Sequence, residues 1–300
     1  MPRIEYVAKR FGAASKALID KANTIIAEYQ AQGFEMTLRQ LYYQLVSRDL
    51  LPNKQKEYKR LGSIINDARL AGLVDWSAIV DRTRHVRQNS HWSGPGEIVA
   101  ACAKQFQIDK WADQDDYVEV FIEKDALLGV IEPSCRSLDV AYFSCRGYTS
   151  QTEAWAAAQR YAAMLRDGRN VTVLHLSDHD PSGIDMTADL QNRMDIFCQG
   201  DDNGRVEVKR IALTMDQVDK YKPPPNPAKE TDSRFESYRE KFGDESWELD
   251  ALEPQVLAQL IADHVHELRD ENKWDAQLER EEAMKATLEK AARKMKKEKP

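Results

Sequence analysis

The chain has 300 residues, of which 42% are hydrophobic, and its formal net charge is −7. This length suffices for two ordinary domains, and the composition excludes a disordered, collagen-like or repeat protein. No apolar run approaches the roughly 18 residues of a membrane span, and residues 1–11 lack the apolar stretch of a signal peptide. Four cysteines without metal-ligand spacing are expected to be reduced structural thiols: Cys102, Cys135, Cys145 and Cys198. We therefore expect a cytoplasmic protein with no membrane partner.

The charge is divided unevenly along the chain. Residues 1–90 contain 15 Lys and Arg against 9 Asp and Glu, whereas residues 91–300 contain 28 against 41. A basic amino-terminal module joined to an acidic one is a pattern that nucleic-acid-binding proteins show. Ordinary variation between two surfaces is the alternative explanation.

Three helices are predicted in the basic module. Residues 15–32 have apolar side chains at helical spacing and end before Gly33, and residues 55–71 do so before Gly72. Between them, Thr37 is expected to cap a helix over residues 38–48 whose apolar stripe consists of Leu38, Leu41, Tyr42 and Leu45. Tyr43 lies about 100° round the helix from Tyr42, because that is the helical repeat. We therefore predict that Tyr42 packs in the core, while Tyr43 leaves the stripe and shares a face with Arg39, four residues earlier.

Basic residues gather where the third helix begins and in the segment that follows it. Lysines and an arginine at the helix start would meet phosphates if this were a recognition helix: Lys54, Lys56, Lys59 and Arg60. Residues 73–87 are expected to form a strand and a wing that carries Arg82, Arg84 and Arg87. Three helices and a basic hairpin predict a winged-helix DNA-binding domain. A small helical bundle with a solvated basic face is the structural alternative.

Strands and helices are predicted to alternate in the acidic module. A polar segment rich in Gly and Pro, residues 88–97, precedes it, and a connecting helix is expected over residues 97–106. Strands are then predicted at residues 117–123, 139–144, 171–177 and 205–213, with helices ending near residue 136 and covering residues 150–166 and 182–197. Such alternation predicts an α/β domain with a mostly parallel sheet.

Acidic residues follow two of these strands. Glu123 closes the first strand, and Asp178 and Asp180 follow the third. Three carboxylates at one sheet edge repel one another unless a cation neutralises them, and hard oxygen ligands favour Mg²⁺. The structural alternative makes Asp178 a helix cap and Glu123 a solvated strand end. His175 is expected to pack inside its strand, whereas His179 should point away from the metal and is available to touch DNA.

The carboxylates belong to a longer pattern. A Glu at the end of a first strand and D-x-D-x-x-G after a third, here Glu123, Asp178, Asp180 and Gly183, resemble the TOPRIM domain of topoisomerases, primases and related nucleases. The resemblance spans roughly residues 115–215. Primases of this class usually carry a cysteine-rich zinc site, which the cysteines here cannot supply.

The basic module narrows the resemblance to one family. The segment TLRQLYYQL, residues 37–45, resembles the arginine and paired-aromatic motif of the topoisomerase VI A subunit and its meiotic double-strand-break relatives, and DHDPSG resembles that family's D-x-D-P-x-G. In those proteins the motif belongs to a winged-helix domain ahead of TOPRIM, and its second aromatic is the nucleophile, which corresponds to Tyr43. The resemblance implies Mg²⁺ at the carboxylates, a phosphotyrosyl link to the DNA 5′ end, and a homodimer in which tyrosine and metal site come from opposite protomers. Arg39 is expected to lower the pKa of Tyr43 or to steady charge on the phosphate.

The chain also departs from the family. It is shorter than most A subunits, as Mini-A proteins of phages and bacteria are, and it has no G-x-x-x-x-G-K-[ST] loop, so ATP-driven strand passage would need a separate ATPase subunit. Arg146, in SCRGYTS, resembles a glycine-containing turn of the family and is a candidate phosphate contact, or an ordinary exposed turn. Two alternatives remain: a TOPRIM nuclease, in phage defence or plasmid elimination, without a covalent intermediate, and a non-catalytic DNA-binding protein. A nucleoid-associated or phage-encoded protein fits each of them.

The predicted organisation therefore has four parts. Residues 1–90 form the winged-helix domain, residues 91–114 a linker with a connecting helix, and residues 115–272 the TOPRIM domain, which ends in a helix over residues 253–268. Residues 273–300 form a charged helical tail, for which a frayed and solvated helix is favoured over a DNA contact. The proline-rich segment 222–229 receives no role.

Overall fold

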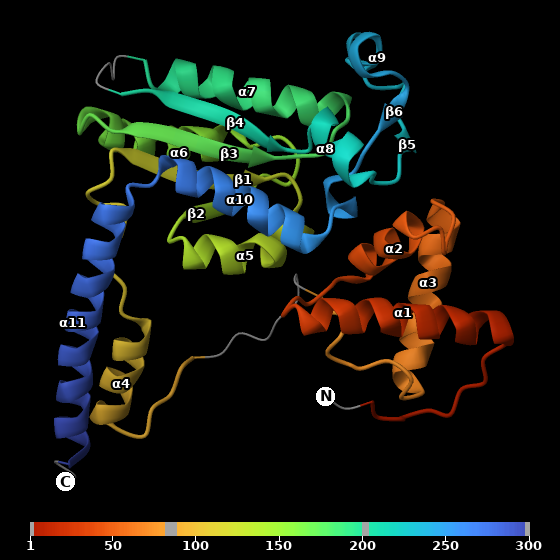
Figure 1. Ribbon diagram of the computed structural model, residues 1–300, viewed down its shortest axis with the longest axis horizontal. Coiled ribbons are helices and arrows are strands. Elements are labelled where there is room, and N and C mark those ends of the chain that lie inside the picture. The colour runs from red at the N-terminus through yellow and green to blue at the C-terminus, as the bar shows by residue number, and fades with distance from the viewer. Residues whose placement is uncertain (1–2, 82–88, 200–203, 298–300) are drawn as a thin grey trace.

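The computed structural model describes residues 3–81, 89–199 and 204–297. It has a helical amino-terminal module, a parallel sheet covered by helices, and a protruding pair of helices (Figure 1). The predicted α/β class is confirmed. None of the helices in the described residues combines the length and the apolar composition that a membrane-spanning helix requires.

Three helices form the amino-terminal module: α1 (Ala13–Ala31), α2 (Leu38–Ser47) and α3 (Gln55–Leu70). Thr37 caps α2 as predicted, because its side chain accepts from the Gln40 N–H while the Gln40 side chain accepts from the Thr37 N–H. The three helices share one core, whose members include Leu18, Ile25, Leu41, Leu45, Leu61 and Ile65. Helix positions predicted from periodicity are thus correct to within a few residues.

The predicted wing is not seen in the part of it that the structure describes. Residues 73–81 contain no strand, and their only pairing is one bridge between Ile79 and Met36. Arg82, Arg84 and Arg87 lie outside the described residues. The module is therefore a three-helix bundle as far as it is described, and the winged helix stays a prediction.

Four parallel strands make up the central sheet: β1 (Asp116–Ile122), β2 (Ala141–Ser144), β3 (Asn170–Leu176) and β4 (Val206–Ala212). Their order is β2-β1-β3-β4, and all three pairings are parallel. The predicted mostly parallel sheet is confirmed. Because every strand runs in the same direction, all carboxyl ends meet at one edge, where the residues after β1 and β3 become neighbours.

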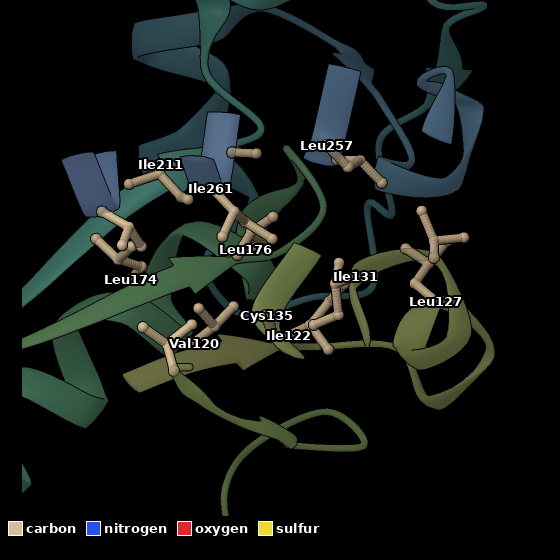
Figure 2. Packing of buried hydrophobic residues seen from close by; sticks show 14 of the residues in the cluster. Val120, Ile122, Leu127, Ile131, Cys135, Leu174, Leu176, Ile211, Leu257 and Ile261 are labelled. Carbon is tan, nitrogen blue, oxygen red and sulfur yellow. The ribbon is translucent and has the colours of Figure 1, made fainter. Parts of the chain in front are cut away.

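Helices cover both faces of the sheet. On one face, α5 (Leu128–Ser137) and α10 (Pro254–Leu268) pack on alternate strand residues such as Val120, Ile122, Leu174 and Leu176 (Figure 2). On the other, α6 (Gln151–Arg166) and α7 (Pro181–Phe197) pack on the intervening residues, including Phe121 and Val173. Burial of one such large apolar side chain contributes about 1.5–3 kcal/mol, so these two cores hold the sheet edge rigidly. The four cysteines are free thiols, as predicted.

The connecting helix and the helical tail pack together. Helix α4 (Pro95–Gln105) lies along α11 (Glu271–Lys297), and the pair protrudes from the sheet domain (Figure 1). Gly96 lies against Lys296, whereas Lys110, just after α4, pairs with Glu281 at 2.8 Å, so the two helices run antiparallel. The predicted tail is helical, and α4 packs along one side of it, while most of its side chains remain exposed.

Short elements that the sequence did not reveal lie between β4 and α10. They are α8 (Met215–Tyr221), α9 (Phe235–Phe242), the two-residue strands β5 (Asn226–Pro227) and β6 (Glu245–Ser246), and a 3₁₀ turn, η2 (Leu249–Ala251); a second 3₁₀ turn, η1 (Asp125–Leu127), precedes α5. Strand β5 belongs to the proline-rich segment, which contacts the amino-terminal module through the Asn53 side chain, 3.4 Å from the Pro225 carbonyl oxygen. Residue Ala251 of η2 enters the core of that module. This segment therefore joins the two parts of the molecule.

Candidate functional site

The carboxylates predicted from the sequence lie together at the carboxyl edge of the sheet. Glu123 follows β1 directly, and its Oε2 accepts a hydrogen bond from the Asp178 N–H at 2.9 Å. Asp178 Oδ1 accepts from the Leu249 N–H at 2.8 Å. The cap of α7 is Asp180, whose Oδ1 accepts from the Gly183 N–H at 2.6 Å. The cap considered at Asp178 therefore belongs to Asp180.

The turn between β3 and α7 requires glycine at its last position. A Cβ atom on Gly183 would lie 2.1 Å from the carbonyl oxygen of Asp178, closer than atoms approach in real structures. The motif D-x-D-x-x-G thus has a local physical cause, since the chain turns back on itself within six residues. This turn sets the directions in which Asp178 and Asp180 leave the backbone.

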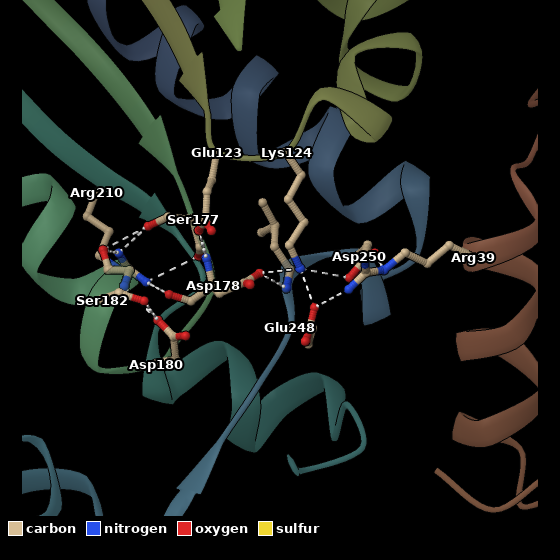
Figure 3. Close-up of polar contacts among 12 residues, drawn as sticks. Arg39, Glu123, Lys124, Ser177, Asp178, Asp180, Ser182, Arg210, Glu248 and Asp250 are labelled. Carbon is tan, nitrogen blue, oxygen red and sulfur yellow. Dashed lines mark hydrogen bonds and ion pairs between the residues drawn. The ribbon is translucent and has the colours of Figure 1, made fainter. Parts of the chain in front are cut away.

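Lys124 neutralises one side of the carboxylate cluster (Figure 3). Its Nζ lies 2.8 Å from Asp178 Oδ1 and 3.1 Å from Asp250 Oδ1, and it also pairs with Glu248. Its side chain is only 16% exposed. Glu248 and Asp250 were not predicted, because they lie just before and within the short 3₁₀ turn η2 and follow no motif.

Arg39 reaches the same cluster from the amino-terminal module (Figure 3). Its Nη2 lies 2.9 Å from Glu248 Oε2 and its Nε lies 2.8 Å from Asp250 Oδ2. The guanidinium carbon lies 5.8 Å from the centre of the Tyr43 ring, which agrees with the shared helix face predicted for the two residues. Arg39 therefore connects the motif of α2 to the sheet edge.

Tyr43 does not leave the core, contrary to the prediction. It is 6% exposed, against 4% for Tyr42, and both belong to the core of the amino-terminal module. The helical repeat describes the faces of α2 alone, whereas η2, which comes about 200 residues later, covers the face that carries Tyr43. Tyr42 has the packing role predicted for it, since its hydroxyl oxygen accepts from the Lys54 N–H at 2.8 Å.

Burial and neighbouring charges determine how the site titrates. Burial, followed by the charges of Asp250 and Glu248, raises the pKa of Tyr43 to about 12, and Arg39 opposes this only in part. Burial and the carboxylate of Glu123 raise the pKa of Asp178 to about 7 despite Lys124. Burial also raises the pKa of Glu123. Burial therefore disfavours the charged forms of Glu123 and Asp178.

One cleft joins the two halves of the site. A cavity of about 510 Å³ is lined from α2 by Arg39, Tyr42 and Tyr43, and from the sheet domain by Asp178, Asp180 and Glu248. The start of α3 borders the same cleft, because Asn53, Gln55 and Tyr58 also line it. Residues more than a hundred positions apart in the sequence thus face one space.

The donors suit a hard cation, but no ligand set is preformed. Asp and Glu oxygens are the ligands that Mg²⁺ prefers. Burial raises the pKa of Glu123 and of Asp178, and so favours binding of a proton or a cation at these carboxylates. Within the described residues, however, no three His, Cys, Asp or Glu side chains are arranged as metal ligands. In this arrangement the ammonium of Lys124 supplies the positive charge at Asp178.

The predicted DNA contacts divide into three groups. Lys54, Lys56, Lys59 and Arg60 are exposed around the start of α3, near the cleft, although Arg60 pairs with Glu57 at 2.8 Å. Arg146 is 75% exposed and has a positive φ of 55°, but it lines a separate groove and lies 3.2 Å from Asp125. Arg82 and Arg84 fall outside the described residues.

Both histidines of the third strand region are buried. The His175 ring lies 2.8 Å from the Thr187 hydroxyl, as expected for packing. His179 is 2% exposed and lies 2.9 Å from the Tyr238 hydroxyl, with Phe242 and Trp247 around it. The suggested DNA contact of His179 is therefore wrong, since aromatic side chains cover it.

Comparison of the chain with protein-family models and with curated proteins finds no match. The resemblance to a family consequently depends on the residues of the two motifs alone.

Proposed function

We propose that the protein cleaves DNA by transesterification, with Tyr43 as nucleophile, in the manner of a minimal topoisomerase VI A subunit with a winged-helix and a TOPRIM domain. The observation that carries this proposal is the shared cleft, which is lined by Tyr43 and Arg39 on one side and by Asp178 and Asp180 on the other. Two motifs that the family combines are thus combined here in space as well as in order.

Each residue has a role in the proposed reaction. The phenol oxygen of Tyr43 attacks phosphorus and loses its proton to water. The bond from phosphorus to the deoxyribose 3′ oxygen breaks, and that oxygen takes a proton from water and leaves as a hydroxyl group. Arg39 binds the phosphate oxygens on which charge develops. Glu123, Asp178 and Asp180 would hold Mg²⁺, which would supply positive charge near the phosphate.

The closed arrangement must open before this reaction. Arg39 is engaged by Glu248 and Asp250, and these two carboxylates help to raise the pKa of Tyr43 to about 12. A cavity of about 510 Å³ has the size of a small-molecule site and does not admit a duplex. Separation of α2 from η2 frees Arg39 for phosphate, removes two negative charges from the phenol and widens the cleft.

Double-stranded DNA and a second copy of the chain are the proposed partners. Two sites in a homodimer make a double-strand break, and exchange of the amino-terminal modules between protomers gives the opposite-protomer pairing of tyrosine and carboxylates that the family uses. A separate ATPase subunit is required only for ATP-driven strand passage. A cytoplasmic, nucleoid-associated location follows from these partners.

A metal-dependent nuclease is the second candidate, and the burial of Tyr43 favours it. A side chain that is 6% exposed, in a core cluster, and with a raised pKa fits a packing role. Water would then attack the phosphodiester, and the carboxylates alone would hold the metal.

Tyr43→Phe separates the candidates, with Tyr42→Phe as the matched control. Each protein is incubated with supercoiled plasmid and Mg²⁺, then treated with denaturant and with protease. The transesterase gives protein-linked breaks in the wild type and in Tyr42→Phe but none in Tyr43→Phe. Free-ended breaks in all three proteins indicate the nuclease instead. No breaks in any of them, together with retained DNA binding, contradict both candidates and favour the non-catalytic DNA-binding protein.

A further inference from the structure

The side chain of Arg210, near the end of β4, donates hydrogen bonds to uncharged oxygen atoms (Figure 3). Its Nη2 donates to the Asp178 carbonyl at 2.6 Å, and its Nη1 donates to the Gly183 carbonyl at 2.7 Å and to the Ser177 hydroxyl at 2.5 Å. Further bonds reach the carbonyls of Ser177 and Leu213 and the Thr187 hydroxyl. In the described part of the chain, Arg210 forms no ion pair with a carboxylate.

Most of the oxygen atoms that Arg210 binds belong to the turn between β3 and α7, which carries Asp178 and Asp180. The turn is so tight that the Asp178 carbonyl lies against the Cα atom of Gly183. Three carbonyl dipoles, those of Ser177, Asp178 and Gly183, consequently point toward one region, where they repel one another unless donors separate them. Arg210 supplies those donors from the neighbouring strand.

Burial of a guanidinium that forms no ion pair costs free energy, so other interactions must compensate for this cost. Burial lowers the pKa of Arg210 to about 10, while Glu123, Asp178 and Asp180 favour its charged form. The side chain therefore stays charged at neutral pH and satisfies its N–H groups on the turn. Only arginine offers five N–H donors in a planar fork, whereas a lysine ammonium offers three from one atom.

From this geometry we propose that Arg210 is a positioning residue: it fixes the turn between β3 and α7, and through it the directions of the Asp178 and Asp180 carboxylates. It touches neither carboxylate group and is not itself a metal ligand. The effect of Arg210 on the turn does not depend on the proposed function, whereas its effect on Mg²⁺ binding rests on the proposed function.

The variant Arg210→Lys separates the effect of hydrogen-bond geometry from the effect of charge. A lysine keeps the positive charge but lacks the planar arrangement of N–H donors of the guanidinium. Arg169→Lys is the matched control: Arg169 also joins main-chain carbonyls, those of Trp111 and Asp116 at 2.8 and 3.0 Å, but at the opposite edge of the sheet. Hydrogen–deuterium exchange without metal is measured for residues 177–187 and for β1. Loss of the charged hydrogen bonds should accelerate exchange of residues 177–187 at least about tenfold in Arg210→Lys alone, with β1 unchanged.

A second measurement follows Mg²⁺ itself. Titration calorimetry with MgCl₂ should give an affinity about 10–100-fold weaker for Arg210→Lys than for the wild type, and wild-type affinity for Arg169→Lys. Ser177→Ala, which removes one acceptor of Arg210, provides a milder variant if Arg210→Lys does not fold, and should accelerate the same segment less. Wild-type exchange of residues 177–187 in Arg210→Lys would overturn the proposal. If the wild type binds no Mg²⁺, the proposed function fails, and the exchange data still decide the role of Arg210.

Discussion

Two cations flank Asp178, and they are bound in opposite ways. Lys124 lies among carboxylates from two regions of the sheet domain, with Asp178 Oδ1 at 2.8 Å and Asp250 Oδ1 at 3.1 Å. Arg210 lies among carbonyl and hydroxyl oxygens, with the Asp178 carbonyl at 2.6 Å. One cation contacts the side chain of Asp178, and the other contacts its main chain.

Because their partners differ, only one of the two charges can be replaced by a metal ion. The carboxylates around Lys124 need positive charge, which a metal ion can supply equally well, because Coulomb attraction does not depend on the identity of the cation. The carbonyls around Arg210 need donors at fixed positions, which an ion does not reproduce. We therefore expect metal to compensate for loss of Lys124 and not for loss of Arg210.

The largest expected effect is that of Lys124→Met without metal. Removal of Lys124 leaves Asp178 without its cation and leaves Glu248 and Asp250 paired with Arg39 alone, which should lower the free energy of unfolding by about 3–5 kcal/mol in urea titrations with EDTA. Mg²⁺ should restore much of this loss. Lys110→Met is the control, because Lys110 is similarly buried beside Glu281 but far from the site. Equal recovery of both variants in Mg²⁺ would contradict an exchangeable charge at Lys124.

A smaller effect is expected for the contact between the modules. In a double-mutant cycle of Arg39→Met and Asp250→Asn, the pair at 2.8 Å should show a coupling free energy of about 1–3 kcal/mol. The cycle is measured by urea unfolding with and without duplex DNA. If Arg39 leaves Asp250 to bind phosphate, the coupling should shrink when DNA is bound. Unchanged coupling with DNA would mean that the closed arrangement persists in the complex.

The smallest effect concerns pH. Burial lowers the pKa of His175 to about 3 and that of His179 to about 4, so between pH 4 and 6.5 the unfolded chain binds protons that the native protein does not, and stability falls on acidification. Asp178 has the opposite sign, because its pKa is raised from 3.8 to about 7 and the native protein binds the extra proton.

Asp178→Asn removes only the opposing group of the three. Its free energy of unfolding, measured in EDTA from pH 7 to 4.5, should therefore fall more steeply with acid than that of the wild type. Asp185→Asn, an exposed carboxylate partner of Arg234, serves as the control and should keep the wild-type slope. A wild-type slope in Asp178→Asn would show that Asp178 titrates normally in the native protein.

The parallel sheet could be predicted because its signals are local. Strands covered on both faces are nearly continuous apolar runs, and caps such as Thr37 and Ser150 mark where helices begin. Glu123, Asp178 and Asp180 could be found because strand ends in a parallel sheet share an edge. This much of the site follows from spacing alone.

The rest of the site is non-local. Glu248 precedes a short 3₁₀ turn and Asp250 lies within it, and nothing near them in the sequence indicates Lys124 or Arg39 as partners. The burial of Tyr43 was not predicted for the same reason, because η2, which is distant in the sequence, packs over it. A helical repeat reports which side chains share a face, and it does not report what packs on that face.

The pairing of α4 with α11 has a consequence for the order of folding. The Ile108 N–H donates to Glu281 across 173 residues of sequence, and everything in the sheet lies between these two positions. Such distant contacts form late, because the intervening chain must first be ordered. During synthesis, α4 leaves the ribosome before α11 has been made and therefore has no helix to pack against. Its apolar side stays accessible to chaperones while the strands of the sheet are synthesised.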